Sequence, residues 1–210
     1  MLRVMLVDDH PIVRHGFAQL LAAEADISVT AQAADARAAI DAVELADVAV
    51  VDVSLGATSG IDLIRDLKER APRIHVLVVS MHDELLYAER ALRAGAAGYM
   101  MKHEATDAIV RAIRTVAAGG MVVSESVSLR LLQRWAANGA PRPESPLDGL
   151  SDRELHVLEL MGRGLGTRGI AEQLHISVKT VESYRARLKD KMNLRSGTEL
   201  VRFAVRWAEK

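Results

Sequence analysis

The chain has 210 residues, half of them hydrophobic and 26% charged, which argues against disorder over most of its length and leaves room for one large or two small domains. It has no cysteine, so a disulfide framework and a thiolate metal site are excluded, and no run of about 18 apolar residues predicts a membrane span. The net charge of −1 conceals an asymmetry: residues 151–210 carry 12 Lys and Arg against 8 Asp and Glu, and this basic part after an acidic first part favours a role on nucleic acid.

Strand-like and helix-like segments alternate through the first 120 residues. The chain begins directly with a strand-like run rather than with a signal-peptide pattern, so we expect a cytoplasmic protein with no membrane partner. Strands are predicted at 3–8, 27–32, 46–52, 74–80 and 99–101, and helices from Pro11, at 34–45, from Ile61, at 83–93 and at 106–118. These strand–helix units predict an α/β fold, a doubly wound five-stranded parallel sheet with the flavodoxin-like order 2-1-3-4-5. No glycine-rich phosphate loop follows the first strand, which disfavours dinucleotide or ATP binding in the usual modes.

The third predicted strand ends in a carboxylate. Residues 48–51 are all apolar, which is typical of a strand buried on both faces of a parallel sheet, and Asp52 follows them. Open α/β folds bind their ligands at the carboxyl edge of the sheet, where this side chain would lie. Asp52 is therefore a candidate covalent acceptor.

Polar side chains also follow three other strands. Asp8 and Asp9 end the first strand, Ser80 ends the fourth and Lys102 follows the fifth, so all of them would lie with Asp52 along one edge. Three neighbouring carboxylates repel one another unless a cation lies among them, and Mg²⁺ suits an all-oxygen site. Asp52 can then attack phosphorus and form an acyl phosphate. Lys102 would supply a positive charge for the phosphoryl oxygens, and Ser80 a hydroxyl that can reorient.

Each of these residues also has an ordinary structural explanation. Asp9 could cap the helix that begins near Pro11, and Asp52 could cap a loop. Ser80 could be a turn residue, and Lys102 could be a solvated lysine. Their occurrence at successive strand ends favours a joint site over four separate explanations.

Four sequence blocks resemble the receiver domain of response regulators in order and spacing. They are Leu-Val-Asp-Asp-His at 6–10, Val-Asp-Val-Ser-Leu at 51–55, Ser-Met-His at 80–82 and Gly-Tyr-Met-Met-Lys at 98–102. The resemblance implies that Asp52 accepts phosphate from a sensor histidine kinase. It also implies that Mg²⁺ is bound by Asp9, Asp52 and the Ser54 carbonyl, with Asp8 alongside.

The same resemblance assigns the residues that sense the phosphoryl group. Lys102 would contact it, and Ser80 and Tyr99 would form a switch pair, the ring turning inward when the hydroxyl engages phosphate. Two departures from the family pattern concern loop shape. Ser-Leu-Gly stands at 54–56 where Met-Pro-Gly is common, and no proline follows Lys102 closely. Both departures bear on the lifetime of the phosphate.

Residues 121–149 are predicted to connect two domains. A helix is predicted at 127–136, and residues 138–149 contain three prolines and two glycines, which is typical of a linker. Beyond it, Ser-Asp-Arg-Glu at 151–154 is a capping box that begins an amphipathic helix. Thr167 is expected to cap a short helix and Ser177 a longer one, and a second capping box at 196–199 begins the last helix.

The short helix, the turn and the longer helix at 178–192 predict a helix-turn-helix within a small all-α domain. Val181, Leu188 and Met192 mark its buried face, and the opposite face is basic and polar, as suits a DNA major groove. The residues that we expect to contact DNA are Ser177, Lys179, Thr180, Glu182, Ser183, Tyr184, Arg187 and Lys191. An ordinary solvated face would explain the same charges.

The second part resembles the LuxR-type DNA-binding domain. The matching blocks are Leu-Ser-Asp-Arg-Glu at 150–154, Ile-Ala at 170–171, Ile-Ser-Val-Lys-Thr-Val-Glu at 176–182 and Glu-Leu at 199–200. The whole chain is therefore similar to two-component response regulators of the NarL/FixJ type, with a receiver at 1–120, a connection at 121–149 and the helix-turn-helix domain at 150–210. Gly169 replaces the usual Glu, and glycine inside a helix costs about 1 kcal/mol relative to alanine, so the short helix should be held less firmly.

Domains of this type commonly dimerise through the last helix, at 198–208 here. Its apolar residues are more than one core face needs, namely Leu200, Val201, Ala204, Val205 and Trp207, and we expect the first four at a dimer interface. The alternative is that they all pack within the domain.

The favoured function is a phosphorylation-controlled transcription regulator that is not an enzyme beyond its own phosphotransfer and dephosphorylation. Its expected partners are a sensor histidine kinase, double-stranded DNA and a second copy of the chain, with RNA polymerase as a further candidate. A phosphatase of the haloacid dehalogenase type would need a second acid two residues after the nucleophile, where Ser54 stands. A third hypothesis is a phosphorylation-independent DNA-binding regulator whose receiver is only a dimerisation module.

Overall fold

The computed structural model describes residues 1–56, 58–104, 106–136, 147 and 149–208. The chain divides into two compact units, Met1–Gly139 and Ala140–Lys210. Most of the predicted linker at 138–149 lies outside the described residues. Within the described residues, no helix is both long enough and apolar enough to cross a membrane.

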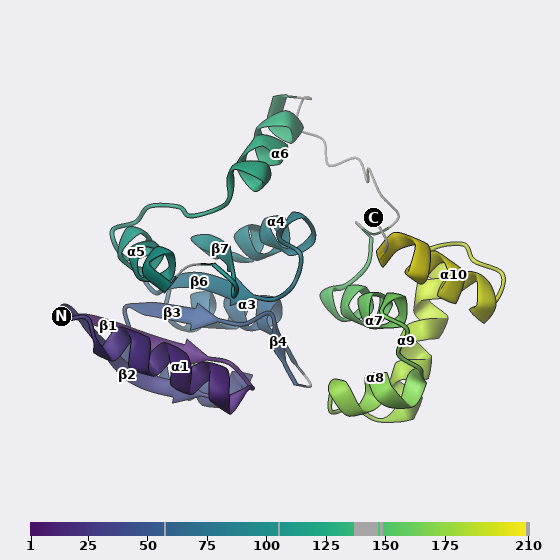
Figure 1. Cartoon of the computed structure of the whole chain (residues 1–210), viewed down its shortest axis with the longest axis horizontal. Helices are drawn as coiled ribbons and strands as arrows, with labels where there is room; N and C mark the ends of the chain where they lie inside the picture. Colours follow the sequence, from purple (N-terminus) through teal and green to yellow (C-terminus); the bar gives the residue numbers. More distant parts are fainter. Residues whose placement is uncertain (57, 105, 137–146, 148, 209–210) are drawn as a thin grey trace. The chain divides into compact units, whose positions relative to one another are not determined.

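The first unit alternates strands and helices (Figure 1). Its elements are β1 (Leu2–Val7), α1 (Pro11–Ala22), β2 (Ile27–Ala33), α2 (Ala36–Ala42), the 3₁₀ turn η1 (Val43–Leu45), β3 (Val48–Val51), β4 (Ser54–Leu55), β5 (Thr58–Ser59), α3 (Gly60–Arg70), β6 (His75–Ser80), α4 (Glu84–Ala94), β7 (Gly98–Met101), α5 (Thr106–Ala117) and α6 (Glu125–Ala136).

Five of these strands form one parallel sheet with the order β2-β1-β3-β6-β7. Numbered among themselves, they have the order 2-1-3-4-5, so the predicted topology is confirmed. All four residues of β3 are buried, as the apolar run predicts. In the register of the central strands, Val7 pairs with Val51, which brings the carboxyl ends of β1 and β3 to the same level.

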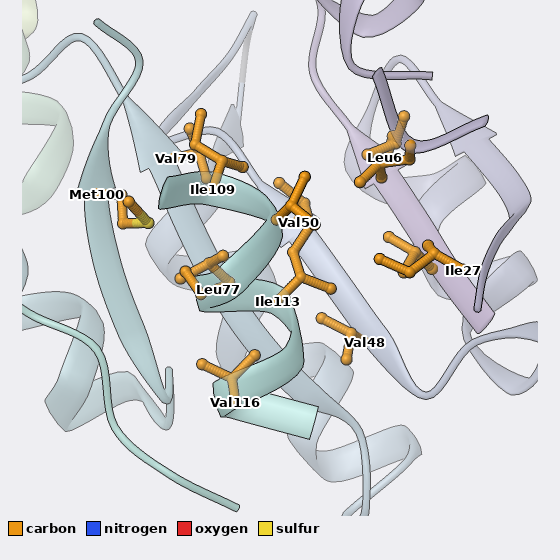
Figure 2. Packing of buried hydrophobic residues seen from close by; sticks show 14 residues of the cluster. Leu6, Ile27, Val48, Val50, Leu77, Val79, Met100, Ile109, Ile113 and Val116 are labelled. Atoms are coloured by element: carbon orange, nitrogen blue, oxygen red, sulfur yellow. The ribbon is translucent and has the colours of Figure 1, made fainter. Parts of the chain in front are cut away.

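Helices α1 and α5 cover one face of the sheet, and α2, α3 and α4 cover the other. Figure 2 shows α5 lying across the strands on a layer of buried aliphatic side chains. The labelled members of this layer are Leu6, Ile27, Val48, Val50, Leu77, Val79, Met100, Ile109, Ile113 and Val116. Burial of one such side chain contributes roughly 1.5–3 kcal/mol to the free energy of folding. The layer therefore stabilises the packing of α5 on the sheet.

Between β3 and α3 the structure contains two short strands that the sequence pattern did not predict. A small antiparallel hairpin of β4 and β5 follows Asp52, the candidate acceptor, in a segment that we call the acceptor loop (residues 52–59, of which 57 is not described). Ser59 caps α3 by accepting a hydrogen bond from the Ile61 amide at 3.2 Å. Gly60 lies so close to the acceptor loop that an added Cβ would meet the Asp52 carbonyl oxygen at 1.9 Å. Glycine is therefore required there by the close approach of two backbones.

The helix expected at 127–136 corresponds to α6, which begins two residues earlier and packs on α4. Val127 is buried in this contact, and the Ser124 hydroxyl donates to Glu84 at 2.7 Å. The guanidinium of Arg134 forms an ion pair with Glu89. Leu129 and Leu132 are exposed, so only part of the apolar pattern of this helix faces α4.

The described residues of the second unit form four helices, α7 (Asp152–Gly162), α8 (Thr167–Gln173), α9 (Val178–Lys191) and α10 (Gly197–Ala208). The capping box of Ser151 and Glu154 is confirmed at the start of α7. Ser177 caps α9 as predicted, by accepting a hydrogen bond from the Thr180 amide at 3.0 Å.

Two predicted caps differ in the structure. Gly166 is the N-cap of α8, without a side-chain hydrogen bond, so the prediction that Thr167 caps this helix is wrong. The Thr167 hydroxyl instead accepts a hydrogen bond from Arg185 of α9 at 2.6 Å. At the last helix, Ser196 accepts from the Glu199 amide at 3.1 Å, but the Glu199 carboxylate accepts from the Arg195 amide rather than closing the box.

Candidate functional site: an acidic edge and a helix-turn-helix

The carboxyl ends of β1, β3 and β7 place three functional side chains together. The Asp52 amide donates to the Val7 carbonyl at 2.9 Å, which continues the β1–β3 ladder by one residue and sets Asp52 beside Asp8. The Lys102 amide donates to the Ser80 carbonyl at 2.8 Å and extends the β6–β7 ladder in the same way. The sheet itself therefore delivers two carboxylates and an ammonium to one edge.

Lys102 joins the two carboxylates. Its Nζ lies 2.7 Å from Asp8 Oδ2 and 2.7 Å from Asp52 Oδ2, and its side chain is only 9% exposed. The alternative that Lys102 is an ordinary solvated lysine is wrong. Removal of one partner of an ion pair buried to this degree would leave an uncompensated charge and would be strongly destabilising.

The electrostatics of this group favour a cation. Burial raises the pKa of the Asp52 carboxyl, the Lys102 ammonium opposes the shift, and the Asp8 carboxylate adds to it. Burial works against the charged form of Lys102, but Asp52 and Asp8 outweigh it and raise the pKa of the ammonium. Lys102 therefore stays protonated, and the pocket retains excess negative charge that another cation would neutralise.

Asp9 faces the acceptor loop rather than the helix that follows it. The N-cap of α1 is His10, without a side-chain hydrogen bond, so the alternative that Asp9 caps this helix is wrong. Its Oδ2 accepts a hydrogen bond from the Gly56 amide at 2.8 Å, next to β4. Its Oδ1 lies 2.7 Å from Nδ1 of the exposed His10 ring, although no hydrogen bond of normal geometry reaches that oxygen.

The acidic edge has the donor set of a metal site. Asp8, Asp9, His10 and Asp52 each offer a ligand atom, and these atoms lie within 4.8 Å of one another. Among the described residues, two buried carboxylate oxygens receive no hydrogen bond, Oδ1 of Asp9 and Oδ1 of Asp52. Buried polar atoms are nearly always paired. A hard divalent cation would supply a partner for both of these carboxylate oxygens. The sequence did not single out His10 as a neighbour of this site.

The two expected switch residues are both buried, and both contact the backbone of His82. The Ser80 hydroxyl oxygen accepts a hydrogen bond from the His82 amide at 3.3 Å. The Tyr99 hydroxyl donates to the His82 carbonyl at 2.9 Å, so its ring lies inward. His82 also reaches the acceptor loop, since its Nε2 lies 2.8 Å from the Ser54 hydroxyl oxygen. The sequence did not identify His82 as a functional residue.

In the second unit, α9 presents the polar face expected of a recognition helix. Val181 and Leu188 are fully buried. The exposed residues of the predicted DNA set are Ser177, Lys179, Glu182, Ser183, Arg187 and Lys191, and Thr180 and Tyr184 are half-buried. The Arg187 guanidinium lies 5.2 Å from the centre of the Tyr184 ring, close enough for a cation–π contact.

Lys191 forms hydrogen bonds that the sequence did not predict. Its Nζ donates to Glu154 Oε2 at 2.7 Å and to the Gly149 carbonyl at 3.1 Å. These bonds join the end of α9 to the beginning of α7. The Lys191 ammonium is therefore bound within the unit, and a contact of this exposed side chain with DNA stays a prediction.

The dimer candidates on α10 divide into two groups. Leu200 and Ala204 are fully buried within the described structure, so the prediction that they offer a dimer surface is wrong. A helix of this pattern directs residues four apart to the same face, and that face packs on α7. Val201 is 39% exposed and Val205 is half-buried, so these two stay candidates.

A doubly wound domain with an acidic sheet edge, followed by a helix-turn-helix unit, defines a two-domain regulator. Residues 4–114 match the response regulator receiver domain, and residues 148–204 match the bacterial regulatory proteins of the luxR family. The chain therefore belongs to the response regulators that carry a LuxR-type DNA-binding domain, and it regulates transcription.

Curated relatives share both parts. The transcriptional regulatory protein DegU of Brevibacillus brevis is 33% identical over 95% of this chain and 91% of its own. The oxygen regulatory protein NreC of Staphylococcus carnosus is 33% identical over 98% of this chain and 97% of its own. The structure of RcsB from Salmonella enterica serovar Typhimurium, bound to promoter rprA in the presence of the phosphomimetic BeF3−, is 26% identical over 97% of this chain and 98% of its own, with a TM-score of 0.61.

Proposed function

We propose that a sensor histidine kinase transfers a phosphoryl group to Asp52, and that this modification controls how the second unit binds double-stranded DNA. The state of the Asp52 carboxylate carries the proposal. It is 5% exposed, its Oδ2 is bound to Lys102, and its Oδ1 receives no hydrogen bond from the described residues. A carboxylate with a purely structural role would have both oxygens paired.

The transfer is a displacement at phosphorus. A carboxylate oxygen of Asp52 forms the new P–O bond while the P–N bond of the donor phosphohistidine breaks, and the leaving imidazole takes up a proton. Lys102 offsets the charge of the phosphoryl oxygens. The Ser80 hydroxyl accepts from the His82 amide, and its own hydrogen bond favours the ionised form of Asp52, so its proton is directed to the side chain that would carry the phosphoryl group.

The chemistry of the site fits Mg²⁺. Asp9, Asp52 and the carbonyl of Ser54 would hold the ion, with Asp8 alongside, and the two unpaired oxygens of Asp9 and Asp52 support this assignment. Bound Mg²⁺ neutralises the carboxylates, so that a negatively charged phosphoryl group can approach. The same charge argument explains why Asp52 needs a cation in order to react as a nucleophile.

The output is proposed to be DNA binding through the exposed face of α9. Lys179 and Arg187 supply the positive charges for phosphate contacts. We also propose a homodimer, formed on phosphorylation or on DNA, with Val201 and Val205 of α10 as its candidate contacts. RcsB has been solved as dimers bound to DNA, which supports this by likeness. RNA polymerase is a further candidate partner, and these partners place the protein in the cytoplasm.

Labelling with a small phosphodonor tests the acceptor assignment. The full chain is incubated with acetyl phosphate or phosphoramidate and Mg²⁺, and phosphate uptake is read by intact mass. Wild type should gain one phosphoryl group, Asp52→Asn none, and chelation of Mg²⁺ should stop the reaction. Asp62→Asn, a change in an exposed carboxylate of α3, is the matched control and should label normally. Undiminished labelling of Asp52→Asn would overturn the proposal.

The link to DNA needs its own measurement. A genome-wide map of bound sites supplies a DNA fragment, and its affinity is measured with and without phosphorylation at one salt concentration, because such affinities depend steeply on salt. A change in affinity for wild type that is absent in Asp52→Asn supports phosphorylation control. Equal affinity in both states would favour a phosphorylation-independent regulator.

A further inference from the structure

His82 lies two residues after Ser80, the last residue of β6, and contacts four side chains of the receiver unit, those of Ser54, Tyr87, Ser80 and Tyr99. Its ring Nε2 lies 2.8 Å from the Ser54 hydroxyl oxygen, in the loop that follows the acceptor. The same ring packs on Tyr87 of α4, with 4.8 Å between the ring centres and planes tilted by 44°. The residue is buried, so these two contacts fix the ring.

The backbone of the same residue contacts both switch side chains. Its amide donates to the Ser80 hydroxyl oxygen at 3.3 Å, and its carbonyl accepts from the Tyr99 hydroxyl at 2.9 Å. The amide and carbonyl of one residue are linked through a single Cα, so a displacement of the His82 Cα affects both bonds. A displacement of the His82 ring would therefore move the His82 backbone that makes these two bonds.

Through these contacts the His82 residue is linked to the acceptor loop and to both switch side chains. With one lone pair of Ser80 Oγ bound to the His82 amide, the hydroxyl proton is directed to the Asp52 side chain, and a phosphoryl oxygen on Asp52 is its proposed acceptor. The Tyr99 hydroxyl is held in place by the His82 carbonyl. The acceptor loop, through Ser54, therefore shares one residue with both members of the switch pair.

We propose that His82 is the positioning residue that couples the acceptor loop to the switch pair, through the hydrogen bond between its ring and Ser54. This inference rests on the proposed phosphorylation of Asp52. The ring does not react with phosphorus; it holds the backbone that orients Ser80 and Tyr99. Loss of the ring, or of the Ser54 hydroxyl, should still allow Asp52 to take up a phosphoryl group. The change in the position of the Tyr99 ring should then no longer follow that uptake as it does in wild type.

Fluorine NMR of the full chain labelled with fluorotyrosine tests the coupling. The chain has three tyrosines, and Tyr99→Phe assigns the resonance of interest. Spectra are recorded with and without beryllium fluoride and Mg²⁺, the fluoride acting as an analogue of the phosphoryl group on Asp52. The fluorine signals of the bound analogue report occupancy of the acceptor in the same spectrum. Occupancy and the Tyr99 response are thus measured separately.

In His82→Ala the ratio of inward to alternative Tyr99 populations should change by about two- to tenfold, as expected for the loss of one hydrogen bond. Ser54→Ala should act in the same direction, and the double variant should be no worse than the stronger single one, because both changes remove the same contact. His82→Gln places an amide at a similar reach and should restore the wild-type ratio. His15→Ala, at an exposed histidine of α1, is the control and should match wild type.

The outcomes separate the two proposals. If wild type shows no bound-analogue signal, or Asp52→Asn keeps it, the acceptor assignment fails. If the analogue binds but the Tyr99 populations of His82→Ala and Ser54→Ala equal those of wild type, the coupling role of His82 is refuted. Additive effects of the two single changes, or failure of His82→Gln to restore the ratio, would also refute it.

Discussion

Replacement of Gly60 by alanine should displace the backbone of Asp52, the proposed phosphoacceptor. The added Cβ would lie 1.9 Å from the Asp52 carbonyl oxygen and 2.9 Å from its carbon, whereas real Cβ contacts stay beyond 3.0 Å. The acceptor loop or the start of α3 must therefore shift by roughly 1 Å, because closely packed interiors have no spare volume to absorb the overlap.

The size of the effect follows from what must move. The obstacle is backbone rather than a flexible side chain, and the Gly60 amide also donates to the Val53 carbonyl at 2.7 Å, so the shift strains a second contact. Overpacking typically costs about 1–3 kcal/mol, and a rigid obstacle places this site at the upper end. A misplacement of about 1 Å can lower a reaction rate by about 10²-fold, which is the loss of labelling rate that we expect for Asp52.

Two measurements on the full chain test this prediction. Hydrogen exchange of the β1 and β3 peptides in increasing urea reports the stability of the first unit, and intact mass reports the rate of labelling by a small phosphodonor. Gly16→Ala in α1 is the matched control, since an added Cβ there meets nothing within 4 Å. It should stabilise the unit by roughly 0.5–1 kcal/mol and label at the wild-type rate. Labelling of Gly60→Ala at the wild-type rate would refute the steric argument.

Three further predictions concern metal, DNA and pH. Asp9→Asn should weaken Mg²⁺ binding, measured by competition with paramagnetic Mn²⁺, because it removes a ligand charge; unchanged binding would contradict the metal assignment. Lys179→Ala and Arg187→Ala should each reduce the salt slope of DNA binding by about one, and an unchanged slope in Lys191→Ala would show that this lysine makes no DNA contact. Burial opposes ionisation of Glu154, but hydrogen bonds from Lys191 and from the capping residue lower the pKa of this carboxyl below its ordinary value of 4.5. Its folded pKa is thus depressed, so its contribution to stability is complete above about pH 4.5 and is lost as the pH falls through the folded value. The urea midpoint of the second unit should therefore fall more steeply on acidification in wild type than in Glu154→Gln.

The sheet and the acidic edge could be predicted because both depend on rules that act along the chain. Alternation of strands and helices restricts the connections to right-handed crossovers, and these restrict the strand order. Once the order is set, residues that directly follow parallel strands must share one edge, and Asp8, Asp52 and Lys102 follow from position alone. The buried face of α9 could be predicted for the same reason, because Val181 and Leu188 repeat at helical spacing.

Contacts between side chains far apart in the sequence could not be predicted. Lys191 has the residue type and position of a DNA contact, yet Glu154, 37 residues earlier, binds its ammonium. On α10 the apolar pattern is wide enough for two faces, and only the packing of the helix decides that Leu200 is buried while Val201 is exposed. Residue type limits what a side chain can do, and tertiary packing selects among those possibilities.

His82 is the extreme case, because two of its functional contacts use atoms that every residue except proline possesses. An amide that orients Ser80 and a carbonyl that holds Tyr99 leave no signature in residue type. Only the ring is specific to histidine, and its bond to Ser54 acquires meaning once the backbone bonds on either side are known. A site defined by chemistry-bearing side chains at strand ends is therefore incomplete. The residue that relates the acceptor to its sensors is recognised only when backbone hydrogen bonds are counted together with side-chain ones.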